Sequence, residues 1–530
     1  MILKHNFVDI LKREIFPALI EIENNILKKI ERISEKCEGY FLPGFIDSHV
    51  HVESSLIIPS EFARMAVVHG TVATVSDPHE IANVIGMEGV LYMIENGKKV
   101  PFHFIFGAPS CVPATIFETA GATLNADDVE KLLLNPDIYY LAEMMDFPGV
   151  LNGDKEALKK IEIAKKLDKP VDGHAPGLRG EMAQKYIDAG IYTDHEAYTY
   201  EEGLDKLKRG MKILIREGSA AKNFDALIPL ITEHSNLIMF CSDDKHPDSL
   251  LLGHINALVA RAVKLGYDTF DVLKCACINP VNHYKIPVGL LQEGKSADFI
   301  VVENLIDFNV LQTYIKGEKV AENGKTLIKR VASELINKFS VTEKKIEDFS
   351  YFPSKNEQVI ECLDGQLITN RLSISLELCI PQNDVLKLVV VNRYSNEPVA
   401  KCFIKNFGFK MGAIASSVAH DSHNIIAVGV NDVEICNAVN LVIKHSGGLS
   451  AVNNEEELIL PLPIAGLMSN DDAWKVAADY TKIDNFSKNI LGSTLKAPFM
   501  SLSFMALLVI PSIKLSDLGL FDGNKFKFIK

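Results

Sequence analysis

The sequence lacks the features of a disulfide-stabilised or dithiol redox protein. Its nine cysteines are odd in number and scattered, no C-x-x-C occurs, and Cys275 and Cys277 are the only close pair. Thiols stay free in a reducing compartment, whereas disulfides are typical of oxidising ones. We therefore expect a cytoplasmic protein whose cysteines are unpaired.

We also expect no signal peptide and no membrane-spanning segment. The N-terminal stretch carries charges throughout, where a signal peptide has an apolar core. The most apolar late stretch, Phe499 to Ile510, is shorter than the about 20 residues that a membrane helix needs, and it ends at Pro511. We expect this stretch to be a buried strand or helix, and we expect no association with membranes.

Clustered basic residues and a glycine-rich phosphate loop are absent too. The chain has 55 Lys and Arg against 69 Asp and Glu, which gives a formal net charge of −14, and the sequence pI is near 5.6. Because binding to nucleic acid needs clustered cations, we expect no nucleic-acid partner. A doubly wound open sheet is disfavoured because no G-x-G-x-x-G follows the first expected strand.

What the sequence does contain is one pattern repeated from residue 41 to residue 285. An amphipathic stretch ends at Gly or Asn and leads into a short apolar run with a polar end, as in GDKEALKKIEIAKKLDKP followed by VDGHAPG. Such alternation of helices and buried strands is typical of parallel sheets. Eight runs are expected as strands, at Phe45–His51, Val72–Asp77, His103–Gly107, Tyr139–Met144, Val171–His174, Tyr192–His195, Ile213–Glu217 and Ile238–Asp243. Eight units predict a closed (β/α)8 barrel.

The 530 residues are enough for two or three domains. Short strands are expected in residues 1–40 and 286–337, and we expect these two flanks to pair into one small composite β-domain. The charged segment 338–358, which contains Pro, Ser and Asn, resembles a linker. The predicted fold class is therefore α/β: a barrel at 41–285, the composite β-domain, and a C-terminal mixed α/β domain at 359–530.

Imidazoles and carboxylates end most of these strands. FIDSHVHVE places His49 and His51 two residues apart, so both side chains leave the same face of a strand. In a closed barrel the strand ends surround one mouth, and His, Asp and Glu are ligands for Zn, Mn and Fe. The predicted ligands are His49, His51, Glu143, His174, His195 and Asp243. Six ligands with one carboxylate able to bridge indicate two metals that share a hydroxide.

Two further polar groups allow more than one interpretation. In SDPHE, Asp77 suits the N-cap of a helix with Pro78 as its first residue, whereas His79 is left open between a structural role, a further metal site and the substrate pocket. His420, Asp421 and His423 either close over the barrel mouth or form an unrelated polar turn.

Together, these motifs resemble a known family. PGFIDSHVHVESS, CSDDKHPD and GKSADFIVVENL resemble the amidohydrolase superfamily, and SDPHEIANVIG, GHAPGL and CSDDKHPDSLLLGHI are similar to bacterial and archaeal adenine deaminases. LPLPIAGLMS and PFMSLSFMALLVIP look like the C-terminal domain of that family, so the resemblance spans nearly the whole chain. Many relatives carry a carboxylated lysine on the fourth strand, whereas adenine deaminases resemble this sequence in using a glutamate, here Glu143.

The resemblance implies hydrolysis of adenine to hypoxanthine and ammonia in purine salvage, with hydroxide bridging two Mn or Fe ions, or alternatively Zn. Asp243 would be a ligand and the general base, and Glu196 is our first choice for the acid at purine N1, ahead of Glu53 and Glu80. Contacts with the substrate are expected from Glu53, Glu80 and Asp244. The fold often self-associates, so we expect a homo-oligomer.

Two other functions compete with this one. A binuclear-metal hydrolase of a cyclic amide, similar to a dihydroorotase or hydantoinase, is disfavoured by Glu143 in place of lysine and by the C-terminal domain. A binding or structural protein that kept the fold is disfavoured by the intact set of six ligands.

Overall fold

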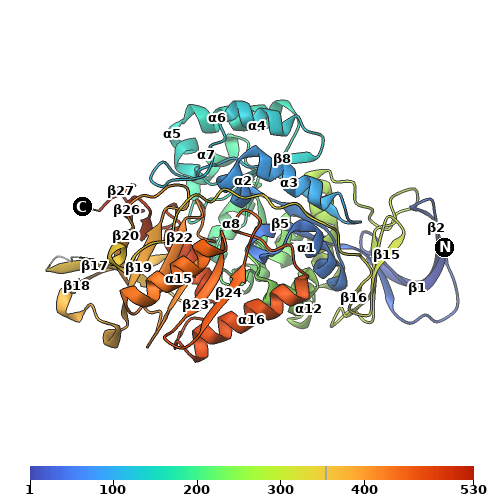
Figure 1. Cartoon of the computed structure of the whole chain (residues 1–530). Coiled ribbons are helices and arrows are strands. Elements are labelled where there is room, and N and C mark those ends of the chain that lie inside the picture. Colours follow the sequence, from blue (N-terminus) through green and yellow to red (C-terminus); the bar gives the residue numbers. More distant parts are fainter. Residues whose placement is uncertain (352–354, 530) are drawn as a thin grey trace.

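The computed structural model describes residues 1–351 and 355–529. Figure 1 shows a β-sheet built around the N-terminus at one end of the molecule, the barrel with its helices in the middle, and the C-terminal sheet with helix α15 (Asp432–Lys444) at the other end; helix α16 (Ala473–Asn489) lies below the barrel, near α12 (Ile255–Lys264). Each of these three parts is built on a β-sheet. The strands of these sheets and the loops between them place the functional side chains.

The middle part is a parallel barrel, which confirms the predicted fold class. Its strands are β5 (Phe45–Val50), β6 (Thr71–Ser76), β7 (His103–Ala108), β8 (Ile138–Met144), β9 (Val171–Gly173), β10 (Thr193–Asp194), β11 (Lys212–Arg216) and β12 (Ile238–Cys241). β5 to β9 pair in order, and so do β10 to β12. The N–H of Asp243 donates to the carbonyl of His49 (2.9 Å), and the N–H of Tyr192 donates to the carbonyl of Val171 (3.4 Å). These two contacts close the ring.

Helices cover the outside of the barrel, and local capping explains where several of them begin. Asn125 accepts from two N–H groups of α4, Asp154 caps α6 and Thr199 caps α8. The longer helices are α1 (Pro59–Ala66), α2 (His79–Ile85), α3 (Met87–Gly97), α4 (Ala126–Leu133), α6 (Lys155–Lys166), α7 (Gly180–Asp188), α8 (Tyr200–Lys208) and α12 (Ile255–Lys264). Because the helices connect successive parallel strands, the loops that follow the strand ends gather at one mouth.

The sheet at the N-terminal end combines strands from both flanks of the barrel. Its order is β16-β15-β14-β13-β4-β1-β2-β3. The strands are β1 (Ile2–Asp9), β2 (Glu14–Glu23), β3 (Ile26–Arg32), β4 (Tyr40–Pro43), β13 (Phe299–Val302), β14 (Val310–Ile315), β15 (Glu318–Glu322) and β16 (Lys325–Thr326). The join is made by β4, which pairs with β1 on one side and with β13 on the other. We propose residues 1–40 with 286–337 as the unit formed around this sheet.

The C-terminal part has an eight-stranded sheet of its own, which we propose as the core of a unit at 359–530. Its order is β18-β17-β20-β19-β22-β21-β23-β24. The strands are β17 (Asn356–Cys362), β18 (Thr369–Ser375), β19 (Val385–Val391), β20 (Ala400–Lys405), β21 (Ala413–Ser416), β22 (Ile425–Gly429), β23 (Gly448–Val452) and β24 (Glu457–Pro461). A small sheet, β25 (Ile513–Ser516), β26 (Gly519–Asp522) and β27 (Lys527–Phe528), follows. The expected linker contains one 3-10 turn, Ile346–Phe349, and its residues 352–354 lie outside the described residues.

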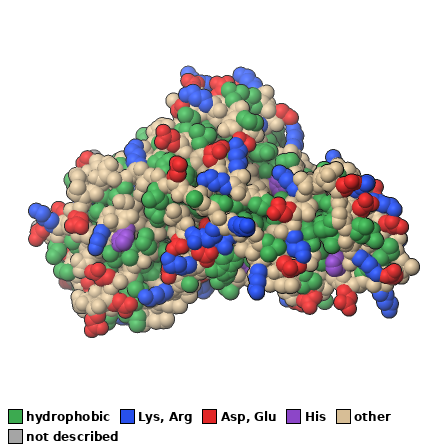
Figure 2. All heavy atoms as spheres, turned by 45° about the vertical axis from the view of Figure 1, so that its right-hand side comes forward, with side chains coloured by type: hydrophobic (Ala, Val, Ile, Leu, Met, Phe, Trp, Pro, Cys, Tyr) green, Lys and Arg blue, Asp and Glu red, His purple; other side chains and the backbone are tan. Residues whose placement is uncertain are grey.

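The apolar stretch near the C-terminus is buried, as expected. It forms α17 (Pro498–Ser503) and a 3-10 turn (Phe504–Ala506), all of whose residues are buried. Within the described ranges, every helix is too short or too polar to cross a membrane. On the face shown in Figure 2, Lys and Arg alternate with Asp and Glu and form no continuous basic band.

Candidate metal centre

Six side chains from five strand ends meet at the barrel mouth; we call them the barrel-mouth cluster. They are His49, His51, Glu143, His174, His195 and Asp243, and all are buried. His49 lies in β5 and Glu143 lies in β8, whereas the other four follow β5, β9, β10 and β12 within two residues. The parallel strands thus bring together residues that are up to 194 positions apart, at the end of the barrel where such enzymes keep their sites.

The distances within the cluster are those of ligands around a cation. His49 Nε2 and His51 Nε2 are 3.2 Å apart, and they lie 3.5 and 3.3 Å from the same oxygen, Asp243 Oδ1. Ligand atoms about 2.1 Å from a shared tetrahedral ion lie roughly 3.4 Å from one another. This spacing fits a metal between the side chains.

Glu143 reaches both sides of the cluster. Its Oε1 lies 3.3 Å from His51 Nε2, and its Oε2 lies 2.7 Å from His174 Nδ1 and 3.2 Å from His195 Nε2. Burial raises the pKa of this carboxyl, but the adjacent histidines outweigh burial and hold the pKa well below its usual range. An ionised carboxylate with one oxygen toward each ligand group can bridge two metals.

The tautomer of His51 suits a ligand. Its Nδ1 lies 3.2 Å from the carbonyl oxygen of Asp77, which can only accept a hydrogen bond. The proton of the neutral ring is therefore on Nδ1, and the lone pair on Nε2 faces the cluster. A carbonyl or carboxylate behind a ligating imidazole is the usual arrangement in metal sites.

Arg216, at the end of β11, orients two carboxylates of the mouth. Its Nη1 donates to Asp243 Oδ2 (2.7 Å), and its guanidinium also forms an ion pair with Glu196. Burial raises the pKa of Asp243, but Arg216 and the histidines outweigh it and keep that pKa well below its usual range. Strand seven was predicted without a functional residue, so reasoning from the sequence missed Arg216; an Arg at the end of a strand that is otherwise apolar was the available signal.

Asp47 is a second residue that the sequence reasoning missed. Its carboxylate accepts from the N–H of Ser242 (2.9 Å) and faces His254 Nε2 (2.7 Å). These contacts fix β5 against the end of β12 directly beneath His49 and Asp243. Asp47 continues the alternation of His49 and His51 by one step, so the same spacing could have identified it.

The other expected site residues are also buried near the mouth. Glu53 Oε1 accepts from the N–H of Ile81 (3.2 Å), and Asp244 Oδ1 accepts from Ser54 Oγ. Glu80 lies against His420 and His423 of the C-terminal part. The loop between β21 and β22 therefore reaches the barrel mouth, which decides between the two interpretations of His420, Asp421 and His423.

The expected cap at Asp77 is wrong by one position. Helix α2 begins at His79 with Pro78 at the N-cap, so Pro78 is not its first residue. Asp77 Oδ1 does accept from the N–H of His79 (3.1 Å), but Asp77 Oδ2 faces the His79 ring at 3.2 Å. The carboxylate thus orients an imidazole as well as supporting the turn.

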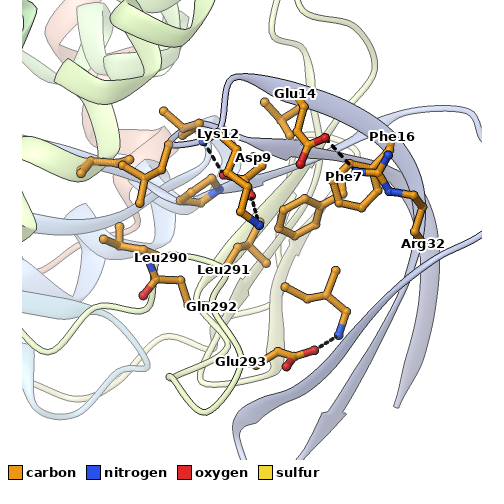
Figure 3. A pocket seen from close by; sticks show the side chains of 16 residues that line it. Phe7, Asp9, Lys12, Glu14, Phe16, Arg32, Leu290, Leu291, Gln292 and Glu293 are labelled. Carbon is orange, nitrogen blue, oxygen red and sulfur yellow. Dashed lines mark hydrogen bonds and ion pairs between the residues drawn. The ribbon is translucent and has the colours of Figure 1, made fainter.

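A groove of about 570 Å³ lies elsewhere, between the strands β1 to β3 and residues 290–293 (Figure 3). Phe7, Phe16 and Leu291 line it, and the Glu14–Arg32 ion pair borders it. None of its lining residues is a histidine or belongs to the barrel-mouth cluster. The groove therefore offers no comparable chemistry.

Two family models match the chain. The amidohydrolase family matches residues 40–320, and the adenine deaminase C-terminal domain matches residues 366–527. The first match contains all six residues of the barrel-mouth cluster, and the second contains His420, Asp421 and His423.

Curated relatives match along the whole chain. Adenine deaminase from Sulfurovum sp. is 58% identical over 100% of this chain and 99% of its own length. The adenine deaminases of Borreliella burgdorferi and Salinibacter ruber are 52% and 54% identical, over 99% and 98% of this chain and 98% and 97% of their own lengths. Among solved structures, β-aspartyl dipeptidase from Fervidobacterium islandicum is 17% identical with a TM-score of 0.47, over 63% of this chain and all of that chain.

Proposed function

This chain belongs to the adenine deaminase family of amidohydrolases, and we propose from that premise how its side chains hydrolyse adenine. The enzyme converts adenine and water into hypoxanthine and ammonia. One observation carries this function: curated adenine deaminases that are 47–58% identical match 98–100% of the chain. A cyclic-amide hydrolase is not favoured, because the C-terminal adenine deaminase domain is present as well.

We propose that the barrel-mouth cluster holds two divalent cations, with Glu143 as the carboxylate common to both. Cations held there lower the pKa of water and so supply hydroxide at neutral pH. Imidazole and carboxylate ligands accept Mn, Fe and Zn. Mn or Fe is our first choice and Zn is the alternative.

Asp243 is the general base of the proposed mechanism. Its Oδ1 faces the histidine pair while Arg216 holds Oδ2, so one oxygen is oriented toward the place where the nucleophile forms. The backbone of Asp243 has a φ of 55°, a conformation that is rare for residues other than glycine and is often found at functional sites. Asp243 takes a proton from the nucleophile and passes it to the amino group that leaves C6.

Attack at C6 also requires a proton at N1, and the structure changes our choice of donor. The oxygens of Glu196 face Arg216, and those of Glu80 face His420 and His423. Among the described residues, no group hydrogen-bonds to Glu53 Oε2, which is buried. We therefore transfer the role of acid from Glu196 to Glu53 and assign Glu196 to positioning Arg216.

The reaction balances with these groups alone. Water loses one proton when it forms the hydroxide, and this proton restores Glu53 at the end of the cycle. As the C6–O bond forms, N1 receives a proton from Glu53; Asp243 then moves the hydroxyl proton to N6, the C6–N6 bond breaks, ammonia leaves, and C6 keeps the oxygen as a carbonyl. Asp244 remains a proposed contact of the purine, whereas Glu80 is withdrawn from that role because its two oxygens face His420 and His423. The side chains of Asp244 and Glu80 border the mouth from β12 and α2.

The experiment that tests this function combines a substrate panel with variants. Adenine, N6-substituted adenines and dihydroorotate are incubated with metal-loaded enzyme, and ammonia and the purine spectrum are followed. We expect rapid turnover of adenine and none of dihydroorotate. Glu53→Gln should reduce kcat more than Glu196→Gln does; the reverse order would return the acid role to Glu196.

We further propose a cytoplasmic homo-oligomer that acts in purine salvage. All nine cysteines are unpaired, as expected in a reducing compartment. Cell fractionation and light scattering of the purified chain test the two parts of this proposal separately.

A further inference from the structure

A second group of histidines and carboxylates lies where the C-terminal part meets the barrel. We infer that His79, Glu80, His420 and Asp421, here called the interdomain cluster, bind a third divalent transition-metal ion. All four side chains are at least 95% buried. His79 and Glu80 begin α2 of the barrel, and the other two lie about 340 residues later, in the loop between β21 and β22. An ion there would join two parts of the chain.

The donor atoms converge as in the barrel-mouth cluster. His79 Nε2 lies 3.6 Å from Glu80 Oε1 and 3.8 Å from Asp421 Oδ1. His420 Nδ1 lies 3.9 Å from Asp421 Oδ1 and 2.5 Å from Glu80 Oε1. Three of these four separations are close to the roughly 3.4 Å expected between ligands of one tetrahedral ion. Two imidazoles and two carboxylates suit Zn, Mn or Fe.

The groups behind the donors orient them as supporting residues do in metal sites. Asp77 Oδ2 lies 3.2 Å from His79 Nδ1, which leaves His79 Nε2 to face the cluster. His423 Nδ1 accepts from the N–H of Ala419, so the proton of a neutral His423 ring lies on Nε2, next to Glu80 Oε2. The second oxygen of Glu80, Oε1, is thereby left toward His79 and His420.

The negative charges of Glu80 and Asp421 indicate that a cation binds between them. Throughout residues 1–351 and 355–529, no Lys or Arg lies within ion-pair distance of Glu80 or Asp421. Asp421 Oδ2 is buried, and no hydrogen-bond donor of the described residues reaches it. Buried carboxylates are stable when they are paired or when they coordinate a metal. The alternative is that His420, protonated, neutralises Glu80 by itself, and this alternative predicts no third ion.

Metal counting on the intact enzyme separates the two explanations. The full chain is produced in Mn-supplemented medium and dialysed against metal-free buffer, and Mn, Fe and Zn are measured per chain by mass spectrometry. We expect three ions per wild-type chain and two in Asp421→Asn and His420→Gln. Glu118→Gln is the matched control, because Glu118 is also buried and is not a ligand; burial, and then the nearby carboxylate of Asp421, raise the pKa of Glu118 to about 8. This variant should keep three ions.

Two ions in the wild type, or three that persist in both variants, would overturn the interdomain site. Anomalous scattering from wild-type crystals gives a second test that needs no variant: a peak enclosed by His79, Glu80, His420 and Asp421 supports the site, and a flat map there refutes it. His195→Gln changes only the barrel-mouth cluster, because the ring of His195 contacts Glu143, Glu196, His49 and His174. Its loss of ions therefore reports on the proposed catalytic pair and leaves the third ion to be judged by itself.

Discussion

Two buried clusters of charged side chains meet at the neighbouring residues Asp194 and His195, and they differ in whether the protein itself supplies a cation. His195 faces the mouth and belongs to the barrel-mouth cluster. Asp194 faces outward, and with Glu202 and Lys206 it forms a closed ion network, the Lys206 network. Lys206 Nζ uses its three donors on Asp194 (2.9 Å), Glu202 (2.7 Å) and the carbonyl of Ala175 (2.7 Å).

The difference teaches how to recognise a metal site in a buried polar cluster. The Lys206 network includes a cation of the protein, the ammonium group of Lys206. The two carboxylates of this network also accept hydrogen bonds from the N–H groups of Ala175, Ala197 and Gly177. The six side chains of the barrel-mouth cluster contain no such cation: Arg216 reaches only the far oxygen of Asp243. Because neighbouring residues of a strand face opposite sides, Asp194 belongs to the Lys206 network, which stabilises the fold, whereas His195 belongs to the barrel-mouth cluster, which can bind metal ions.

The largest effect should follow from removing a charge of the barrel-mouth cluster. Asp243→Asn keeps the shape of the side chain but cannot accept the proton, so we expect kcat to fall by about 10²–10⁴-fold, up to about 5.5 kcal/mol. Circular dichroism should show an intact fold. A deamination rate near that of the wild type would refute the role of Asp243 as base.

The next largest effect should be on stability, not chemistry. Lys206→Met leaves Asp194 and Glu202 buried without a cation, and we expect a loss of about 3–5 kcal/mol. The measurement is the thermal midpoint, with Lys208→Met on the exposed side of α8 as the control, which should change stability by less than about 0.5 kcal/mol. If Lys206→Met left the midpoint unchanged, the network would not hold the fold.

Arg216→Lys tests the contacts of the Arg216 guanidinium with Asp243 and Glu196 at the barrel mouth. Lysine keeps the charge but cannot hold Asp243 and Glu196 at once with a planar fork. We expect kcat to fall by about 10–100-fold, the usual cost of losing a group that orients metal ligands. Metal content and thermal midpoint are measured on the same sample; a change in KM alone would contradict this role.

The smallest effect should come from Glu202→Gln. Lys206 keeps its contact with Asp194, and the amide oxygen can still accept from the N–H of Gly177, so we expect a loss of about 1 kcal/mol or less. A shift of the thermal midpoint as large as that of Lys206→Met would show that Glu202, and not Asp194, is the main partner of the lysine.

Much of the barrel could be predicted from the sequence, because its signals are local. Each strand is a short apolar run and each ligand ends such a run, so counting the runs predicts both the fold and the convergence of His49 and Asp243 on one mouth. The flank strands before residue 40 were visible for the same reason. The one helix cap that was predicted, at Asp77, was wrong by one position, because Pro78 is the N-cap and His79 begins α2.

Long-range charge pairing could not be predicted in this way. Arg216 faces Glu196 and Asp243 because the barrel closes, and Lys206 reaches Asp194 because α8 packs on β11, the neighbour of β10. No periodicity encodes these pairs. The contacts of Glu80 with His420 and His423 cross some 340 residues and depend on how two sheets dock, which the local pattern does not contain.

The strand β4 has a consequence for the order of events during synthesis. Its partner β13 begins 256 positions after β4 ends, so at about 5–20 residues per second the ribosome delivers that partner roughly 13–50 s later. Until then the edge of β4 that β13 will cover stays unpaired while the barrel strands emerge. A chain truncated before residue 299 would keep that edge permanently exposed, and aggregation of such fragments is the expected result.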